Sequence, residues 1–244
     1  SWYRRQRQMC IRDSPDTLCW IHDFTYADNE HMSNMYFWHP AYDDYPVVGI
    51  TWQQCNAFNV WRTQLLNSWR KNHMLSFVQD FRLPSETEWE YAARGGLDNN
   101  PYPWGGPYIR NSRGCFLGNF KPLRGRYMED GGFHTVKANS YHPNDFGLYC
   151  MSGNVAEWCR TAFDESVYEY GHDMNTEYIY HALDHDPPSM KRKVVRGGSW
   201  KDIGYYLQTG TRSYEYQDTA KSYIGFRSVM NYLGRGGPNK EGDF

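Results

Sequence analysis

The sequence has 244 residues, with 26 lysines and arginines against 28 aspartates and glutamates, and its formal net charge is −2. This balance gives no indication of a basic surface that binds nucleic acid, and no apolar run approaches the roughly 20 residues that a membrane-spanning helix needs. Because no internal repeat and no Gly/Ser/Pro-rich linker divides the chain, we expect one domain.

Aromatic residues make up 18% of the chain, while its mean hydropathy is −0.84. This combination suits a loop-rich fold held together by large amphipathic side chains, and it also suits a carbohydrate-binding surface. The cysteines form no CxxC motif and no zinc-site spacing, and an oxidising compartment would permit disulfides whose partners the sequence does not assign. They are Cys10, Cys19, Cys55, Cys115, Cys150 and Cys159.

The N-terminal tail, residues 1–14, reads SWYRRQRQMCIRDS and is basic without any pattern. It resembles a translated sequencing adapter, so we expect it not to be native, and Cys10 would then not count among the cysteines. We interpret residues 15–244 as a single domain that lacks its natural N-terminal part.

Two helices are predicted in the first half of the chain. Residues 15–49 are aromatic and polar without a helical period, and we interpret them as loop with short strands. Residues 51–72 should form a helix, since Thr51 and Gln54 match a capping box and apolar residues recur at helical spacings. A second helix opens at Ser85, with Glu88 as the capping-box partner, and ends near Gly95.

Strands are expected within residues 77–83 and at residues 194–196 and 225–230. Between residues 96 and 144, Gly, Pro, Asn and Asp recur every few positions, which indicates turns and irregular loops. The pattern as a whole indicates an α+β fold with much coil.

The stretch 146–160, FGLYCMSGNVAEWCR, places the carboxylate of Glu157 among apolar neighbours. A carboxylate in such a setting must find a cation, a set of N–H donors or a proton. Two interpretations stay open: a buried acid bonded to backbone donors, or a ligand of a hard cation such as calcium.

GNVAEW within this stretch is the second of four short sequence blocks, and their order along the chain is informative. The others are RLPSETEWEYAARGG at 82–96, VVRGGSW at 194–200 and GFRSV at 225–229. Together they resemble the formylglycine-generating-enzyme (sulfatase-modifying factor) superfamily. The resemblance implies that superfamily's α+β fold, a C-type-lectin-like variant with two helices, short strands and long loops.

Longer phrases cover residues 35–52 (MYFWHPAYDDYPVVGITW), 114–127 (GCFLGNFKPLRGRY) and, almost without a break, 186–227. They resemble the GldK/PorK gliding-motility lipoproteins of the Bacteroidetes type IX secretion system. That resemblance implies a non-enzymatic structural subunit on the periplasmic face of the outer membrane, tethered by a lipid on the missing N-terminal part. Copies of the chain would form a ring with a GldN/PorN-like protein.

Enzymes of the superfamily oxidise a substrate cysteine and hold copper(I) with two cysteines that follow the GGS block, since copper(I) needs soft thiolate ligands. The matching positions here are Asp202 and Leu207. We therefore expect no catalytic residues and no copper. A formylglycine-generating oxidase and a lectin-like ligand-binding module are the alternative functions.

The same resemblance implies calcium sites. One would use Asn119, Asp130 and backbone carbonyls such as that of Gly132. The other would use Glu157, although Cys150 stands where its partner ligand is expected, and a thiol suits a hard cation poorly. The alternative is that Asn119 and Asp130 organise turns.

Three surface features remain. His172, His181 and His185, in the acidic insertion 164–186, lack a third convergent ligand, so a solvated loop is favoured over a metal site. The basic run 190–196 is interpreted as an edge strand kept soluble by charge, or as a docking face for an acidic partner. Most tyrosines after Trp200 should serve the core, and exposed ones would anchor contacts together with the insertion.

Overall fold

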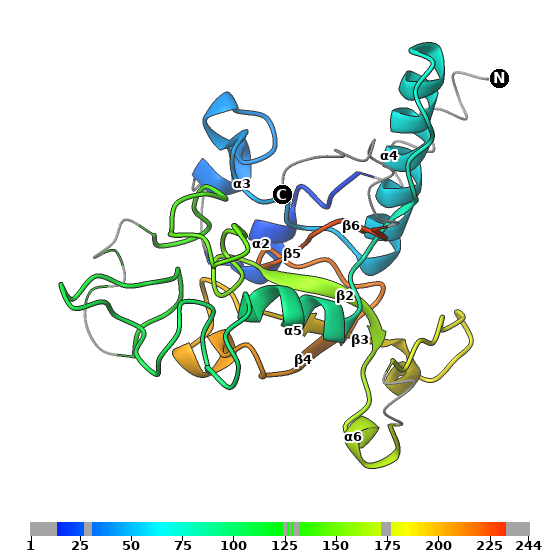
Figure 1. The fold of residues 1–244 in the computed structure, drawn as a ribbon. Coiled ribbons are helices and arrows are strands. Elements are labelled where there is room, and N and C mark those ends of the chain that lie inside the picture. The colour runs from blue at the N-terminus through cyan, green and yellow to red at the C-terminus, as the bar shows by residue number, and fades with distance from the viewer. Residues whose placement is uncertain are drawn as a thin grey trace, which may run out of the picture.

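A computed structural model describes residues 14–26, 31–123, 126, 128, 132–171 and 177–232, and its strands form two sheets (Figure 1). The larger sheet has the order β4-β3-β2-β5, in which β2 runs antiparallel to β3 and parallel to β5. Its strands are β2 (Ala156–Ala162), β3 (Arg192–Arg196), β4 (Ser213–Tyr216) and β5 (Ile224–Phe226), and the smaller sheet pairs β1 (Phe81–Arg82) with β6 (Val229–Met230).

Both predicted helices are confirmed with their caps. Helix α4 (Trp52–Asn72) begins after Thr51, whose hydroxyl accepts the Gln54 N–H while the Gln54 side chain accepts the Thr51 N–H. Helix α5 (Glu86–Arg94) has the same reciprocal cap and ends at Gly95, which adopts the left-handed conformation at φ +59°. These local signals decide the helix boundaries because each cap satisfies backbone N–H groups that have no partner inside the helix.

Shorter helices accompany the two predicted ones, and the prediction of short strands within residues 15–49 was wrong for the described part of that stretch. Three α-helices of four or five residues also occur in the described part of the chain: α2 (Cys19–Asp23), α3 (His31–Met35) and α6 (Val167–Tyr170). Such helices are barely longer than one turn, so no hydrophobic period can announce them. None of the described helices is long and apolar enough to cross a membrane.

The strand predictions were right in place and inexact in extent. The expected strand within residues 77–83 shrinks to β1. The expected strand at 225–230 divides into β5 and β6, which belong to different sheets. The longest strand, β2, was not predicted, because its residues are buried on both faces and show no alternation.

Large aromatic side chains join the loops to the sheets. Trp158 on β2 is fully buried beside Ile50 and Val195, and its indole N–H donates to the Ile50 carbonyl at 3.0 Å. A second cluster stacks Trp20 on Trp200, with ring centroids 5.8 Å apart. The indole bodies thus fill the core while some of their N–H groups tie backbone carbonyls of irregular segments.

The basic run that ends in β3 is not an edge strand, contrary to prediction, because β3 lies between β4 and β2. Lys193 and Arg196 are fully buried. The Lys193 ammonium lies 4.2 Å from the centroid of the Trp52 ring and donates to the Tyr180 carbonyl. A docking face that includes Lys193 is therefore excluded as well. Two basic residues of β3, Lys193 and Arg196, therefore bond groups in the interior.

Candidate functional site

The GNVAEW block forms a crossing point of three chain segments. Gly153 has φ +81°, and a β-carbon there would lie 2.5 Å from the carbonyl oxygen of Asn119. The next residue, Asn154, binds Val136 with both ends of its side chain, and its carbonyl accepts the N–H of Trp200 at 2.9 Å. Glycine is required at this approach because any side chain would separate the segments.

Glu157 follows on β2 and is 6% exposed. One carboxylate oxygen accepts the Trp89 indole N–H at 2.8 Å and the Arg227 Nε–H at 3.1 Å, and the other accepts an Arg227 Nη2–H at 2.9 Å. The Glu157 charge raises the pKa of Arg227. The partners of the carboxylate are therefore side chains, where one sequence interpretation expected backbone donors.

This arrangement fits calcium poorly at Glu157, because both carboxylate oxygens already accept hydrogen bonds from the Arg227 guanidinium. The nearby Cys150 does not improve the fit. Burial, reinforced by the Glu157 charge, raises the pKa of the Cys150 thiol to about 11, so the sulfur stays protonated at neutral pH.

The other calcium position is only partly described. Asn119 is 3% exposed and its amide donates to the His134 carbonyl at 2.6 Å. A β-carbon at Gly132 would lie 2.7 Å from the Asn119 Oδ1, so these two residues are close together, as the resemblance implied. Asp130 lies outside the described residues. Within the described ranges no group of three or more His, Cys, Asp or Glu side chains could hold a metal, and the calcium site at Asn119 and Asp130 stays a prediction.

The two positions that match the superfamily's copper ligands serve packing and turn formation. Leu207 is fully buried in a cluster with Tyr102, Phe116 and Phe120, and its carbonyl accepts the Ser152 hydroxyl at 2.6 Å. The Asp202 carboxylate accepts the N–H and hydroxyl of Ser199. Neither side chain is a thiol, and the Leu207 side chain has no atom that can bind a metal.

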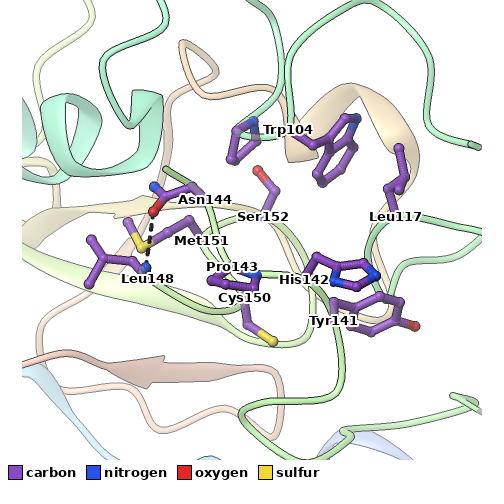
Figure 2. A pocket seen from close by; sticks show the side chains of 11 residues that line it. Trp104, Leu117, Tyr141, His142, Pro143, Asn144, Leu148, Cys150, Met151 and Ser152 are labelled. Atoms are coloured by element: carbon purple, nitrogen blue, oxygen red, sulfur yellow. Dashed lines mark hydrogen bonds between the residues drawn. The ribbon is translucent and has the colours of Figure 1, made fainter. Parts of the chain in front are cut away.

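A small cavity of about 40 Å³ adjoins this region (Figure 2). Trp104, Ser152, Cys150 and His142 contribute to its wall, and the cavity has room for only a few water molecules. It is too small for a peptide substrate.

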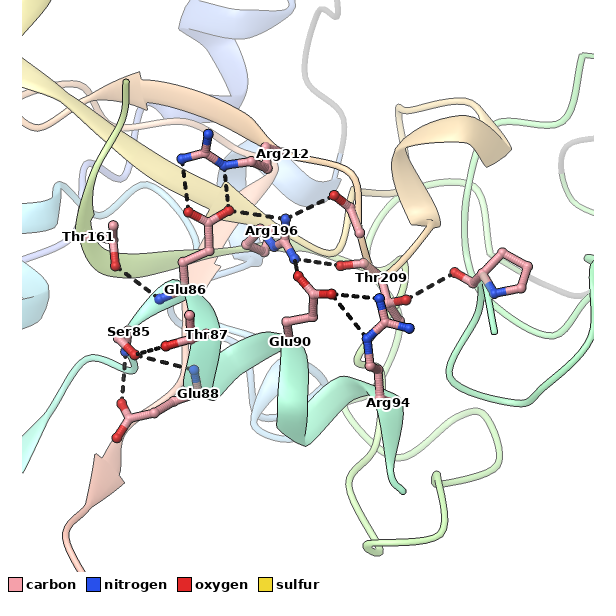
Figure 3. Close-up of polar contacts among 12 residues, drawn as sticks. Ser85, Glu86, Thr87, Glu88, Glu90, Arg94, Thr161, Arg196, Thr209 and Arg212 are labelled. Carbon is pink, nitrogen blue, oxygen red and sulfur yellow. Dashed lines mark hydrogen bonds and ion pairs between the residues drawn. The ribbon is translucent and has the colours of Figure 1, made fainter. Parts of the chain in front are cut away.

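A charged network that sequence reasoning missed joins α5 to β3 and to the start of β4 (Figure 3). Arg196, fully buried, binds Glu86 at 3.1 Å and also contacts Glu90. Arg212 binds both oxygens of Glu86 at 2.6 and 2.9 Å, while Arg94 binds Glu90 at 2.6 Å. The spacing of Glu86, Glu90 and Arg94 by four residues was the available signal, since such residues share one face of a helix.

This network lies beside a cavity of about 520 Å³ that includes Glu86, Glu90, Arg94, Tyr168 and Glu177 in its wall. Glu86 and Glu90 each already bind two arginines. Because their charges are compensated, Glu86 and Glu90 do not form a free acid–base pair of the kind that general catalysis uses.

The other predicted features that the structure describes lie largely at the surface. The His181 ring packs 5.5 Å from that of Trp52, His185 is exposed on a segment without helix, and His172 lies outside the described residues. Most of the tyrosines after Trp200 do not serve the core, contrary to prediction. Tyr205, Tyr206, Tyr214 and Tyr216 are 59%, 41%, 42% and 37% exposed.

The chain belongs to the family of sulfatase-modifying factor enzyme 1-like domains, whose model matches residues 16–232. It is 34% identical over 191 residues to an inactive C-alpha-formylglycine-generating enzyme 2 of Bos taurus, covering 75% of this chain and 50% of that protein. It is 30% identical over 190 residues to a formylglycine-generating enzyme of Streptomyces coelicolor, covering 75% and 52%. The chain thus spans about half the length of these curated relatives.

A solved structure, that of PvdO from Pseudomonas aeruginosa, matches with a TM-score of 0.58 at 22% identity, covering 76% of this chain and 61% of that one. The family's fold, with few helices, short strands and much irregular structure, is confirmed. Because the relatives include both active and inactive enzymes, family membership alone assigns no activity.

Proposed function

We propose that this chain is a non-enzymatic structural subunit of the type IX secretion and gliding machinery. In this proposal it is a GldK/PorK-like lipoprotein on the periplasmic face of the outer membrane, where it forms a ring with copies of itself and a GldN/PorN-like protein. The long phrases at 35–52, 114–127 and 186–227 are the basis for this choice within the family.

One observation carries the non-enzymatic part of the proposal. Leu207, at the position of the second copper-binding thiolate, is fully buried among aromatic side chains, and the adjoining cavity measures about 40 Å³. Copper(I) chemistry needs thiolates and access for a substrate cysteine. Leu207 offers no thiolate, which favours a non-enzymatic scaffold.

The surface after Trp200 suits protein contacts. Tyr205, Tyr206, Tyr214 and Tyr216 expose rings whose hydroxyl groups can bond while the ring body is buried in an interface. The described parts of the insertion 164–186 add exposed Tyr168, Tyr170 and Leu183. A ring needs two different contact faces on each subunit, since its contacts run head to tail.

The test uses the native full-length protein in three measurements: competition with a copper(I) chelator, oxidation of a cysteine peptide of the sulfatase type, and co-purification with the GldN/PorN-like protein. We expect no copper binding, no peptide oxidation and a stable complex. Turnover of the peptide, or no association with any component of the secretion ring, would refute the proposal. A glycan array provides the control for the lectin-like alternative and should give no hits.

A further inference from the structure

The cavity of about 520 Å³ beside the charged network has walls from two parts of the chain. Helix α5 contributes Glu86 and Glu90, which follow each other on one face of the helix. The insertion 164–186 contributes Tyr168, on α6, and Glu177. Binding sites for small molecules usually measure about 300–1,000 Å³, so the size of this cavity suits a ligand. The charges in its wall indicate the class of ligand.

Carboxylates line this cavity, whereas most of the arginines that bind them do not. Glu86, Glu90 and Glu177 form part of the wall, together with one arginine, Arg94. Within the described residues, the other arginines of these ion pairs do not line the cavity: Arg160, Arg196 and Arg212. The Glu86 carboxylate, for example, lies between two of these guanidinium groups (Figure 3). The ion pairs thus direct their negative ends to the cavity, which favours a cation there.

The carboxylates are also held in place and partly withdrawn from water. Glu86 is buried, and Glu177 is fixed to the α5 side of the cavity because the Thr87 hydroxyl donates to it at 3.4 Å and Arg160 at 3.3 Å. Partial burial weakens the screening of a charge by water and salt. Side chains that are already ordered lose little further freedom when a ligand binds. Both effects strengthen the attraction for a cation.

The acceptor positions that remain free select an ammonium group. A carboxylate offers about four lone-pair positions on its two oxygens. Three N–H groups of Arg196 and Arg212 occupy Glu86 and leave one position on Oε2. Three N–H groups of Arg94 and Arg196 leave the same position on Glu90. A guanidinium binds best to both oxygens of one carboxylate, which neither residue offers, whereas an ammonium has three separate donors.

Two tyrosine rings provide an apolar part of the wall. Tyr91 on α5 and Tyr168 on α6 are both exposed, so their rings stand where the cavity meets solvent. Tyr168 is supported from behind by Arg212, whose guanidinium carbon lies 5.0 Å from the ring centroid. An alkyl stem can pack on such rings while its charged end reaches the carboxylates, and the ring faces themselves attract cations.

We propose that this cavity binds a primary ammonium group on an apolar stem, carried by a free diamine or by a lysine side chain of another protein. Glu177 and the Oε2 atoms of Glu86 and Glu90 accept the ammonium hydrogens, and the rings of Tyr91 and Tyr168 hold the stem. The inference stands on the cavity and its ion pairs and does not depend on the secretion role.

Isothermal titration calorimetry of the native protein with three probes of similar length tests the charge selection. Cadaverine carries two ammonium groups, 1,5-pentanediol has the same stem without charge, and glutarate carries two carboxylates. Cadaverine should bind about tenfold or more tightly than either control, and added salt should weaken it. The acetylated amide of lysyl-lysine identifies the source: tighter binding than cadaverine assigns a lysine of another protein, and weaker binding assigns a free diamine.

Glu177→Gln and Glu165→Gln are a matched pair within the insertion. Glu165 binds Arg192, has a side chain 75% exposed and does not line the cavity. E177Q should weaken cadaverine about fivefold, while E165Q should leave its affinity unchanged. Tyr168→Ala should weaken it about threefold, the size of an exposed cation–π contact. Tyr108→Ala, at a similarly exposed ring that does not line the cavity, should have no effect.

Thermal unfolding of each variant guards against misfolding. Glu177 lies outside the buried network of Glu86, Glu90 and Arg196, so E177Q should keep the native fold. If E177Q were unfolded, Tyr168→Ala against Tyr108→Ala would carry the same test. Equal binding of cadaverine and 1,5-pentanediol, tighter binding of glutarate, or no binding of cadaverine and the lysine dipeptide would overturn the proposal. So would native affinity in a folded E177Q, or equal losses in E177Q and E165Q.

Discussion

Replacement of Glu157 by glutamine removes a buried negative charge while keeping the size of the side chain. Arg227 then faces a neutral amide, and its guanidinium loses the partner that compensates its desolvation. Loss of one partner from a buried ion pair typically costs 3–5 kcal/mol. Because the Arg227 side chain is 26% exposed and Trp89 can still donate to the new amide, we expect a loss of about 3 kcal/mol in the free energy of unfolding.

Urea unfolding of four proteins measures this: native, E157Q, R227Q and the double variant. We expect the double variant to lose less than the sum of the single losses, with a coupling energy of about 1–3 kcal/mol. Each series should be run with calcium and with a chelator. The ion-pair interpretation requires the same cost in both.

A cost for E157Q below about 0.5 kcal/mol, the range of neutral surface substitutions, would refute this reasoning. A cost that appears only when calcium is present would show that Glu157 is a calcium ligand and that its pairing with Arg227 is secondary.

Three further predictions concern stability. Gly153→Ala should lower the free energy of unfolding by about 3 kcal/mol, because φ is +81° and the new β-carbon would lie 2.5 Å from the Asn119 carbonyl oxygen. The control Gly106→Ala, at φ +74° with no atom within 4 Å, should lower it by about 1 kcal/mol in the same urea assay. Burial, reinforced by nearby aspartates, raises the pKa of Cys19 from 9.0 to about 12. The unfolded chain thus releases this proton first, and native stability should fall above about pH 9 by up to about 1.4 kcal/mol per pH unit, more steeply than in Cys19→Ala. Burial lowers the pKa of Lys193 from 10.5 to about 8, so this lysine makes the free energy of unfolding rise with pH between those values. Lys193→Met should lose that rise in unfolding curves recorded from about pH 7 to 10.5. If the pH dependence of stability in either variant equals that of the native chain, the corresponding pKa assignment is contradicted.

The parts of the fold that the sequence predicts are those encoded by neighbouring residues. The caps of α4 and α5 use residues three positions apart, so both helices could be placed to within one residue. Strand β2 could not, because its AEWCRTA sequence is buried on both faces and its pairing partners lie more than 30 residues away. Short apolar runs of this kind do not distinguish a buried strand from other buried structure.

The candidate site shows the same division. Glu157 was identified as an unusual carboxylate from its neighbours alone, but its partners Trp89 and Arg227 are 68 and 70 positions away in the sequence. Lys193 was expected at the surface because charged residues almost never lie fully buried without a partner. Its partners, the Trp52 ring and the Tyr180 carbonyl, are brought to it only by the folded chain.

The four sequence blocks that identify the family coincide with the contacts that connect its elements. Glu88 in the first block binds Arg82 at 2.6 Å, and Trp89 donates to Glu157 of GNVAEW. Arg196 of VVRGGSW binds Glu86 and Glu90, and Arg227 of GFRSV closes the group on Glu157. Each block thus contributes a side chain that bonds to a side chain of another block, independently of what stands at positions 202 and 207. The family signature therefore reports a scaffold and by itself assigns no activity.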